Sequence, residues 1–211
     1  MKKCIIAGGG DPCLIPHKDA LYIAADRGLV LLRGNGIEPD LVIGDFDSTS
    51  YPQDISPERI LKLPVEKDDT DTMYAVKEAL SMGCDDIELY GCTGGRLSHT
   101  IANIQTLRYI REHGASGRII SDDSVVMLIS SGEIRTFPQH SESDILSVFA
   151  QNRAQVEIHG CLYSGRYELD CTFPLGVSNR ITDKEAVIHS ESGELLVIHE
   201  FHDTSDLLHK C

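Results

Sequence analysis

Apolar residues in the first half of the chain form short runs that alternate with segments of helical periodicity. The runs predict strands at residues 3–7, 21–26, 40–45, 59–64, 86–91 and 117–121. A short helix is expected over residues 29–36, and longer helices are expected over residues 68–83 and 97–113. Strands that alternate with helices favour a mostly parallel sheet flanked by helices, which is an α/β arrangement.

The two longer helices are predicted from apolar positions three or four residues apart. Met73, Val76 and Leu80 mark the first of them, which begins among acidic residues and can end at Gly83. The repeat in the second helix comprises Leu97, Ile101, Ile104 and Leu107. Both patterns predict helices with one apolar face.

The pattern changes near Ser121, where short alternating stretches replace the helical repeats. Strands are expected at residues 124–130, 132–137, 145–150, 154–160, 185–190 and 193–200, with turn residues between them. Such a pattern is typical of an all-β sandwich. We therefore predict an α/β domain at residues 1–121 and a β-sandwich domain at residues 122–211, with the boundary within residues 118–124.

Composition narrows the class of protein. The 211 residues carry a formal net charge of −14, and an acidic field repels nucleic acid, so no nucleic-acid partner is expected. No segment approaches the roughly 20 apolar residues of a membrane span, and the apolar run at residues 4–7 is too short for a signal peptide. The seven cysteines include no C-x-x-C pair, which argues against disulfides and a thiolate zinc site. We expect a cytoplasmic protein without a membrane partner.

Acidic residues gather directly after two of the predicted strands. Asp45 and Asp47 in GDFDS point to the same side of an extended chain, where two carboxylates suit Mg²⁺. A second group, Asp68, Asp69 and Asp71, opens the helix at residues 68–83. This second group is compatible with helix capping or with metal binding, and its combination with GDFDS favours metal.

A glycine loop and a histidine pattern complete the candidate chemistry. GCTGGRLSHTIAN, at residues 91–103, offers backbone N–H groups before a helix, and Arg96 adds a forked cation for phosphate. The stretch HEFH at residues 199–202 is one residue short of H-E-x-x-H, so we expect ordinary surface residues there.

Taken in order, ADRG, GDFDS, DDTD, GCTGGRLSHTIAN and GVSN resemble the motifs of the thiamine pyrophosphokinase family across nearly the whole chain. The resemblance implies transfer of a diphosphate from ATP to thiamine with Mg²⁺, giving AMP. It also implies a homodimer with thiamine bound between subunits. The first domain would then bind ATP and metal, and the second would bind thiamine and form the dimer.

The resemblance also implies site residues. The metal would be held by Asp45, Asp47, Asp68 and Asp71. Asp45, Asp47 and Asp71 would form the catalytic set, with Asp71 also orienting or deprotonating the thiamine hydroxyl. The nucleotide would be bound by Gly9, Asp26, Arg27, Thr93, Gly95, Arg96, His99 and Asn103. Thiamine would be bound by Ser48, Tyr163, Ser178 and Asn179, with Tyr163 as the packing aromatic because the chain has no Trp.

One departure and two alternatives accompany this resemblance. The family usually has Asp where this chain has Ser98, so one charge is missing. The stretch DFDST also fits the start of haloacid-dehalogenase-like phosphatases, in which the first Asp attacks phosphate, although that motif usually follows the first strand. A non-catalytic nucleotide sensor is the second alternative, and the Ser98 departure favours it.

Overall fold

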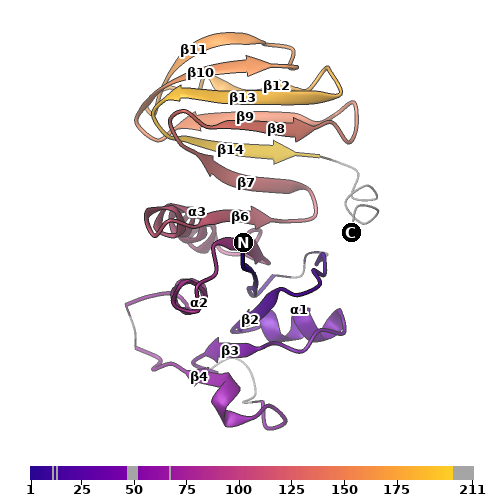
Figure 1. The fold of residues 1–211 in the computed structure, drawn as a ribbon, viewed down its shortest axis with the longest axis vertical. Coiled ribbons are helices and arrows are strands. Elements are labelled where there is room, and N and C mark those ends of the chain that lie inside the picture. Colours follow the sequence, from indigo (N-terminus) through magenta and orange to yellow (C-terminus); the bar gives the residue numbers. More distant parts are fainter. Residues whose placement is uncertain (11, 13, 47–51, 67, 202–211) are drawn as a thin grey trace. The chain divides into compact units, whose positions relative to one another are not determined.

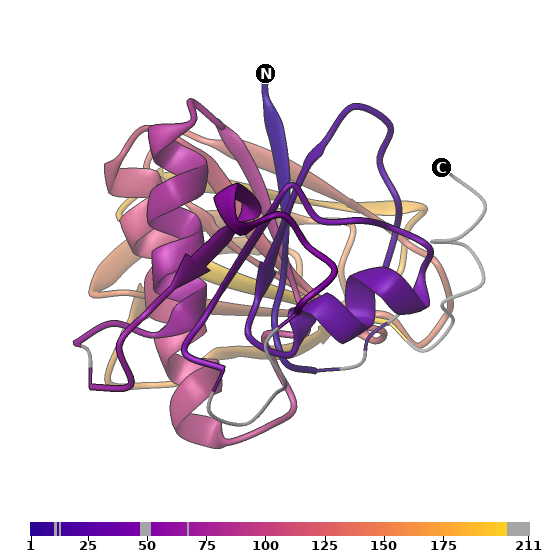
Figure 2. The same cartoon turned by 90° about the horizontal axis from the view of Figure 1, so that it is seen from below.

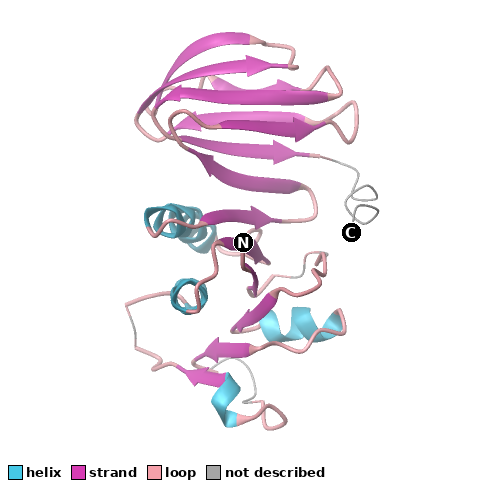
Figure 3. Cartoon of the chain, viewed as in Figure 1, coloured by secondary structure: helices cyan, strands magenta, loops and turns pink. Residues whose placement is uncertain are grey.

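The computed structural model describes residues 1–10, 12, 14–46, 52–66 and 68–201, and the chain divides into two compact units, Met1–Ser121 and Asp122–Cys211 (Figure 1). Within the described residues, helices occur only in the first unit, as Figure 3 shows. None of these helices is long and apolar enough to cross a membrane. The protein therefore combines a few helices with many strands, as the sequence predicts at the level of fold class.

The first unit is built on a parallel sheet. Its strands are β1 (Lys3–Ala7), β2 (Leu21–Ala25), β3 (Leu41–Gly44), β4 (Ile60–Lys62), β5 (Asp86–Tyr90) and β6 (Ser116–Ile120). They pair in the order β4-β3-β2-β1-β5-β6. The chain builds outward from β1 to β4 and then returns to the other side of β1. A crevice for ligands forms where such a sheet reverses direction, at the carboxyl ends of its strands.

Helices cover both faces of this sheet (Figure 2). Helix α1 (Gly28–Gly34) packs against β1 and β2, α2 (Asp71–Ser81) packs against α3 and strands β1 to β3, and α3 (Leu97–Glu112) packs against β6. A short 3₁₀ helix, η1 (Pro57–Arg59), precedes β4. Gly28 is required where α1 meets β1, because a Cβ there would lie 1.8 Å from the Ala7 carbonyl oxygen.

The apolar repeat predicts α3 correctly, but only its second half, Ile104 and Leu107, lies on the buried side of the helix. Leu97 and Ile101 are 74% and 51% exposed, whereas Thr106, Leu107 and Ile110 are buried. A close contact with the sheet sets this face, because a Cβ on Gly117 of β6 would lie 2.9 Å from Ile110 Cδ1. The first turn of α3 instead presents its apolar side chains to solvent, beside the glycine loop.

The second unit consists of two antiparallel sheets. One has the strands β7 (Ser124–Ile129), β9 (Ile145–Ala150), β12 (Gly176–Arg180) and β14 (Leu195–Glu200), in the order β12-β9-β14-β7. The other has β8 (Ile134–Pro138), β10 (Arg153–His159), β11 (Gly165–Asp170) and β13 (Glu185–Ser192), in the order β11-β10-β13-β8. Their inner faces form one apolar core, in which Leu146 and Val197 of the first sheet join Val156 and Ile188 of the second.

Strands β11 and β12 have no counterpart among the predicted strands. Each lies at the end of its sheet order, and most of its residues are exposed or half-buried. An edge strand buries little apolar surface, so its sequence lacks the regular alternation that marks a half-buried strand. The residues GVSN, read in the sequence as a binding motif, lie within β12.

Candidate active site

Loops from neighbouring strands of the first unit meet at the carboxyl edge of the parallel sheet. Asp26 follows β2, and its backbone N–H donates to the carbonyl oxygen of Ile43 in β3 over 2.8 Å. A Cβ on Gly44 would lie 3.4 Å from Asp26 Cα, so the ends of β2 and β3 are in contact. Asp45 comes directly after Gly44, and the fold therefore brings Asp26 and Asp45 to neighbouring positions on one edge.

The backbone at these two strand ends is unusual. Asp26 and Phe46 have φ values of 51° and 57°, in the left-handed region that disfavours residues with a Cβ. Such a conformation costs about 1–3 kcal/mol and persists where the surrounding structure imposes it, often at functional sites. Both Asp26 and Asp45 are half-buried. The strain and the partial burial coincide with the acidic residues that the sequence marks.

The strand order reverses between β1 and β5, and the loops that follow these two strands are in close backbone contact. We call this contact between Gly8–Gly10 and Tyr90–Gly91 the backbone seam. The Gly8 N–H donates to the Tyr90 carbonyl over 2.7 Å, and the Gly10 N–H donates to the Gly91 carbonyl over 3.0 Å. Gly91 has a φ of 65°, and a Cβ there would lie 2.8 Å from the Gly10 carbonyl oxygen. Glycines at these positions therefore let the two loops approach at the crevice, and they leave Gly9 exposed between them.

The three aspartates at the start of α2, Asp68, Asp69 and Asp71, lie in different surroundings. Thr70 is the N-cap, and its hydroxyl accepts a hydrogen bond from the Met73 N–H over 3.1 Å. Asp69 forms an ion pair with Lys77, and Asp68 is exposed. Asp71, the first residue of α2, is half-buried and has one carboxylate oxygen that water does not reach. Thr70 rather than Asp71 therefore caps the helix, and Asp71 is the acidic residue of its first turn.

Asp71 lies at the same edge as Asp26 and Asp45. The segment before α2 starts at the end of β4, where the Leu63 N–H donates to the Gly44 carbonyl over 2.9 Å. Helix α2 then packs against β1, β2 and β3. Because it follows β4 and precedes β5 in a parallel sheet, its start is expected at the carboxyl end of the strands. One oxygen of Asp26 is also buried from water. Half-buried carboxylates thus come from three separate segments.

The glycine loop after β5 carries the basic residues of the site. Arg96, the N-cap of α3, and His99, on its first turn, are both exposed. They contact each other through the guanidinium Nη2 and the imidazole Nε2. Ser98 is exposed as well, while Thr93 is half-buried. Gly94 and Gly95 leave the loop before Arg96 open, because a Cβ on either would meet nothing within 4 Å.

Asn103 has a contact that the sequence does not reveal. Its buried side-chain amide donates to the Cys92 carbonyl over 2.7 Å and so fastens the glycine loop to α3. The Cys92 thiol donates to the Tyr90 carbonyl over 3.4 Å, and burial raises its pKa to about 12. Both side chains hold the loop in place, and the protonated thiol is a poor nucleophile.

Three of the four residues that the family resemblance assigns to thiamine, Tyr163, Ser178 and Asn179, belong to the second unit. Tyr163 and Asn179 line one cavity of about 250 Å³, together with Tyr167, Leu169, Leu175 and Val177. The Asn179 side-chain oxygen accepts from the Tyr163 N–H, and its amide nitrogen donates to the Tyr163 carbonyl, each over 2.9 Å. Asn179 thus fixes the loop that carries the exposed tyrosine ring. Ser178 has a φ of 59°, and its N–H donates to Ser147 Oγ over 3.1 Å.

Two predicted residues, Asp47 and Ser48, lie outside the described residues. Asp45 follows β3, the third strand along the described chain, whereas the motif of the phosphatase alternative usually follows the first strand. The haloacid-dehalogenase pattern therefore does not fit the topology. Of the remaining thiamine candidates, Tyr163 and Asn179 line the cavity of the second unit, and Ser178 lies next to Asn179 on β12.

Comparison with known proteins identifies the family. The family model "Thiamin pyrophosphokinase, catalytic domain" matches residues 14–117. The chain is 29% identical over 215 residues to a thiamine pyrophosphokinase of Bacillus subtilis (strain 168), covering 94% of this chain and 98% of that relative. Both matches indicate the thiamin pyrophosphokinase family. The matched segment of this family includes Asp26, Asp45, Asp71 and Arg96.

Solved structures agree with the family in fold. A thiamine pyrophosphokinase from Bacillus subtilis superposes with a TM-score of 0.84 at 24% identity, covering 96% of this chain and all of that one. A thiamin pyrophosphokinase from Geobacillus thermodenitrificans gives a TM-score of 0.78 at 25% identity, covering 97% of this chain and 99% of that one. The similarity to thiamin pyrophosphokinases therefore extends over both units.

Proposed function

We propose that this protein is a thiamine diphosphokinase, which transfers a diphosphate from ATP to the hydroxyl of thiamine and releases AMP. The observation that carries this proposal is the meeting of the family's ordered motifs at one edge of the parallel sheet. Asp26, Asp45, Asp71 and the glycine loop come from four separate segments of the chain. The enzyme is thus assigned from the family and from its own site.

The donor set at this edge fits Mg²⁺. Carboxylates are the hard oxygen ligands that Mg²⁺ prefers, and the candidates Asp26, Asp45 and Asp71 are all half-buried. Asp47 and Asp68 are further candidates in the proposed metal site. When bound, Mg²⁺ would neutralise charge on the ATP phosphates. The ATP phosphates and these carboxylates are all anionic and repel one another. A cation between them is therefore required if the carboxylates are to bind the nucleotide.

The backbone seam and Arg96 are proposed to bind the nucleotide. Gly9 lies exposed between the Gly8 and Gly10 contacts, and a Cβ there would lie 3.8 Å from Arg27 Cβ. Arg96 can bind phosphate with its forked donors, and its contact with His99 orients the guanidinium. Arg27 is exposed at the end of β2, and Thr93 and Gly95 complete this set. Asn103 acts by holding the loop through Cys92.

Asp71 is proposed to orient the attacking hydroxyl of thiamine. Its position at the start of α2 is fixed by the Thr70 cap and by packing of the helix on β1 to β3. An ordinary carboxylate is a weak base for an alcohol, so alignment of the oxygen contributes more than proton removal. We expect Asp71→Asn to lower turnover by about 10²–10⁴-fold, the range for a positioned acid–base group.

The second unit is proposed to bind the acceptor and to form a homodimer. Tyr163 offers an exposed ring for packing on a heterocycle, beside a cavity of suitable size, with Ser178 and Asn179 on the adjacent strand β12. Leu162, Phe173 and Leu175 are exposed apolar residues of the same unit, and a second copy of the chain would cover them. Free buried thiols, such as those of Cys4 and Cys161, support a reducing compartment like the cytoplasm.

A product assay tests the function. Purified protein is mixed with ATP, Mg²⁺ and thiamine, and the nucleotides are separated. AMP that appears in step with thiamine diphosphate is the expected result. ADP would indicate an ordinary kinase, free phosphate would indicate a phosphatase, and bound ATP without turnover would indicate a sensor. Any of these three outcomes would refute the proposal. Sedimentation equilibrium tests the dimer separately.

A further inference from the structure

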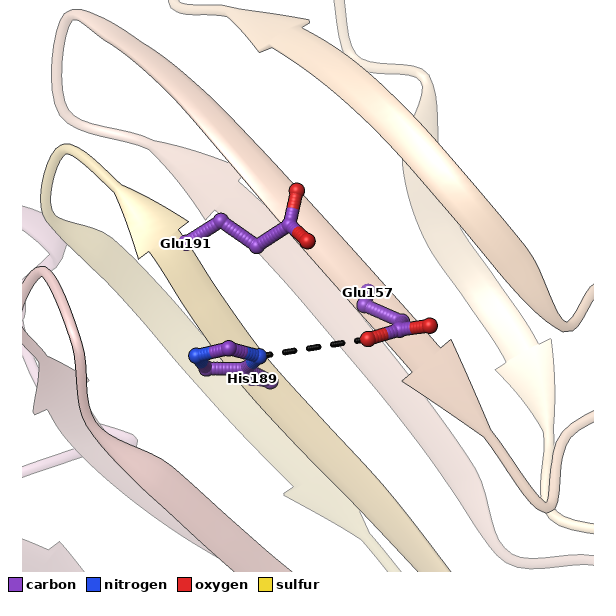
Figure 4. A group of neighbouring side chains, drawn as sticks. All are labelled: Glu157, His189 and Glu191. Carbon is purple, nitrogen blue, oxygen red and sulfur yellow. Dashed lines mark ion pairs between the residues drawn. The ribbon is translucent and has the colours of Figure 1, made fainter.

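A second cluster of ligand-type side chains lies in the second unit, away from the cavity that carries Tyr163. Glu157 on β10 and His189 on β13 are directly opposite each other in the antiparallel ladder. Glu191 follows two positions along β13 and therefore projects from the same side of the strand. Figure 4 shows the three side chains on one face of these strands. One ligand atom from each lies within 4.8 Å of the other two.

The strands hold this cluster on a rigid base. The alternate residues Val156, Ile158 and Ile188 are buried in the core of the second unit, on the side opposite to the cluster. The side chains of Glu157, Glu191 and His189 are 25%, 27% and 32% exposed, so each is partly withdrawn from water. Charges in such a setting are screened less than charges in open solvent.

The two carboxylates share a cation. Arg166 Nε lies 3.4 Å from Glu157 Oε1 and 3.3 Å from Glu191 Oε1, while its side chain is 69% exposed. A cation is already accommodated between the two glutamates, and the long, exposed arginine can move away from it.

We propose that Glu157, His189 and Glu191 form a binding site for a divalent transition-metal ion, with Zn²⁺ as its representative. Imidazole nitrogen together with carboxylate oxygen favours such an ion over Mg²⁺ or Ca²⁺, which prefer oxygen alone. His189 Nδ1 lies 3.9 Å from Glu157 Oε2, and neighbouring ligands of a tetrahedral Zn²⁺ are about 3.4 Å apart. Small rotations of the glutamate side chains would shorten this distance to the spacing of bound ligands.

His159 is a further candidate donor, outside the three-residue cluster but in contact with Glu157. It lies two positions after Glu157 on β10, and its Nε2 is 3.3 Å from Glu157 Oε1. Zn²⁺ commonly takes four ligands from nitrogen and oxygen donors in a tetrahedral arrangement. The bound ion would join β10 to β13 across the ladder. This site is independent of the proposed transfer reaction, because none of its residues belongs to the proposed active site.

A network of ordinary ion pairs is the competing interpretation, and Arg166 distinguishes the two. If the cluster binds metal, Arg166 competes with the ion for Glu157 and Glu191, so Arg166→Gln should tighten Zn²⁺ binding. His189→Asn and Glu191→Gln each remove a ligand and should weaken binding at least about tenfold. Glu168→Gln is the matched control. Glu168 lies on β11, two positions after Arg166, and is outside the cluster.

The experiment is calorimetric titration of metal-free full-length protein with Zn²⁺, in excess Mg²⁺ so that oxygen sites are occupied. Co²⁺ added in place of Zn²⁺ reports nitrogen ligation through its visible absorption. We expect a site that weakens in His189→Asn and Glu191→Gln, tightens several-fold in Arg166→Gln and is unchanged in Glu168→Gln. Equal affinity in the wild type and His189→Asn, weaker binding in Arg166→Gln, or no Zn²⁺ binding would each overturn the proposal. Glu191→Gln decides the question if His189→Asn fails to fold.

Discussion

Gly91 offers the sharpest test of how the crevice is built. An alanine Cβ at this position would lie 2.8 Å from the Gly10 carbonyl oxygen and 3.1 Å from that of Gly8, in a backbone with φ of 65°. Gly91→Ala therefore combines two costs, left-handed strain and a backbone clash. Gly94 shares the strain, with φ of 84°, but a Cβ there meets nothing within 4 Å. Gly95 lies in the same loop and has neither cost.

The magnitudes follow from these three environments. Left-handed strain alone costs an alanine about 1 kcal/mol, which is the expected loss for Gly94→Ala. Overpacking against backbone adds about 1–3 kcal/mol, so Gly91→Ala should lose about 2–4 kcal/mol. Gly95→Ala should gain about 0.4–1 kcal/mol, because alanine restricts the unfolded chain. For a chain of this size, a loss of about 3 kcal/mol lowers Tm by about 6–12 °C.

Differential scanning calorimetry of the three variants measures this order directly. The expected ranking of Tm is Gly95→Ala above the wild type, then Gly94→Ala, then Gly91→Ala. Because the two loops form the crevice, Gly91→Ala should also raise the KM for ATP. A Tm for Gly91→Ala equal to or above that of Gly94→Ala would refute the close approach of the two loops.

Three further predictions concern single side chains. Asp71→Asn should lose turnover while keeping the far-UV circular dichroism of the wild type, whereas Glu78→Gln on the same helix should keep its rate; similar rates would contradict the role of Asp71. Burial lowers the pKa of His199 from its ordinary value of 6.5, although Asp144 raises it, so the unfolded chain binds more protons as pH falls below 6.5. Urea denaturation should show this stability present above pH 6.5 and lost below it, and a His199→Phe variant with the same loss would exclude the mechanism. Iodoacetamide should label the exposed Cys171 and spare native Cys92, and rapid labelling of Cys92 would contradict its burial.

Periodicity predicts elements in this chain better than it predicts their faces. The helix at residues 68–83 is found as α2, with Thr70 as its cap and Gly83 at a φ of 79° after its end. Leu97 and Ile101 correctly indicate α3, yet both face solvent. A repeat shows that residues share a side of a helix, whereas contact with β6 decides which side is buried.

Other features depend on long-range contacts that no local pattern contains. The stretch HEFH predicts surface histidines, but His199 is buried, 3.4 Å from the fully buried Asp144 and stacked on His140. That prediction is wrong for His199 because β14 pairs with β7 and β9 on both sides. The strained φ of Asp26 and the bond from Asn103 to Cys92 also arise from packing between distant segments.

Candidate residues are easier to predict than their partners. The sequence marks Asp26, Asp45 and Asp71 through motifs after strands, and the structure brings these segments to one edge. It also marks Tyr163 and Asn179, which line one cavity. The sequence does not show that Thr70 rather than Asp71 caps α2, or that the Asn179 amide binds the Tyr163 backbone. Those assignments need the pairing of atoms in three dimensions.

The central place of β1 has a consequence for how the chain folds during synthesis. Cys4 pairs with Leu21 on one side and with Ile87, far downstream, on the other. The edge of β1 that faces β5 therefore stays open until β5 has left the ribosome, and contacts of such long sequence separation form slowly. Docking of β5 closes this edge and also brings Gly91 against Gly10. Docking of β5 on β1 and the close approach of the two glycine loops are thus the same folding event.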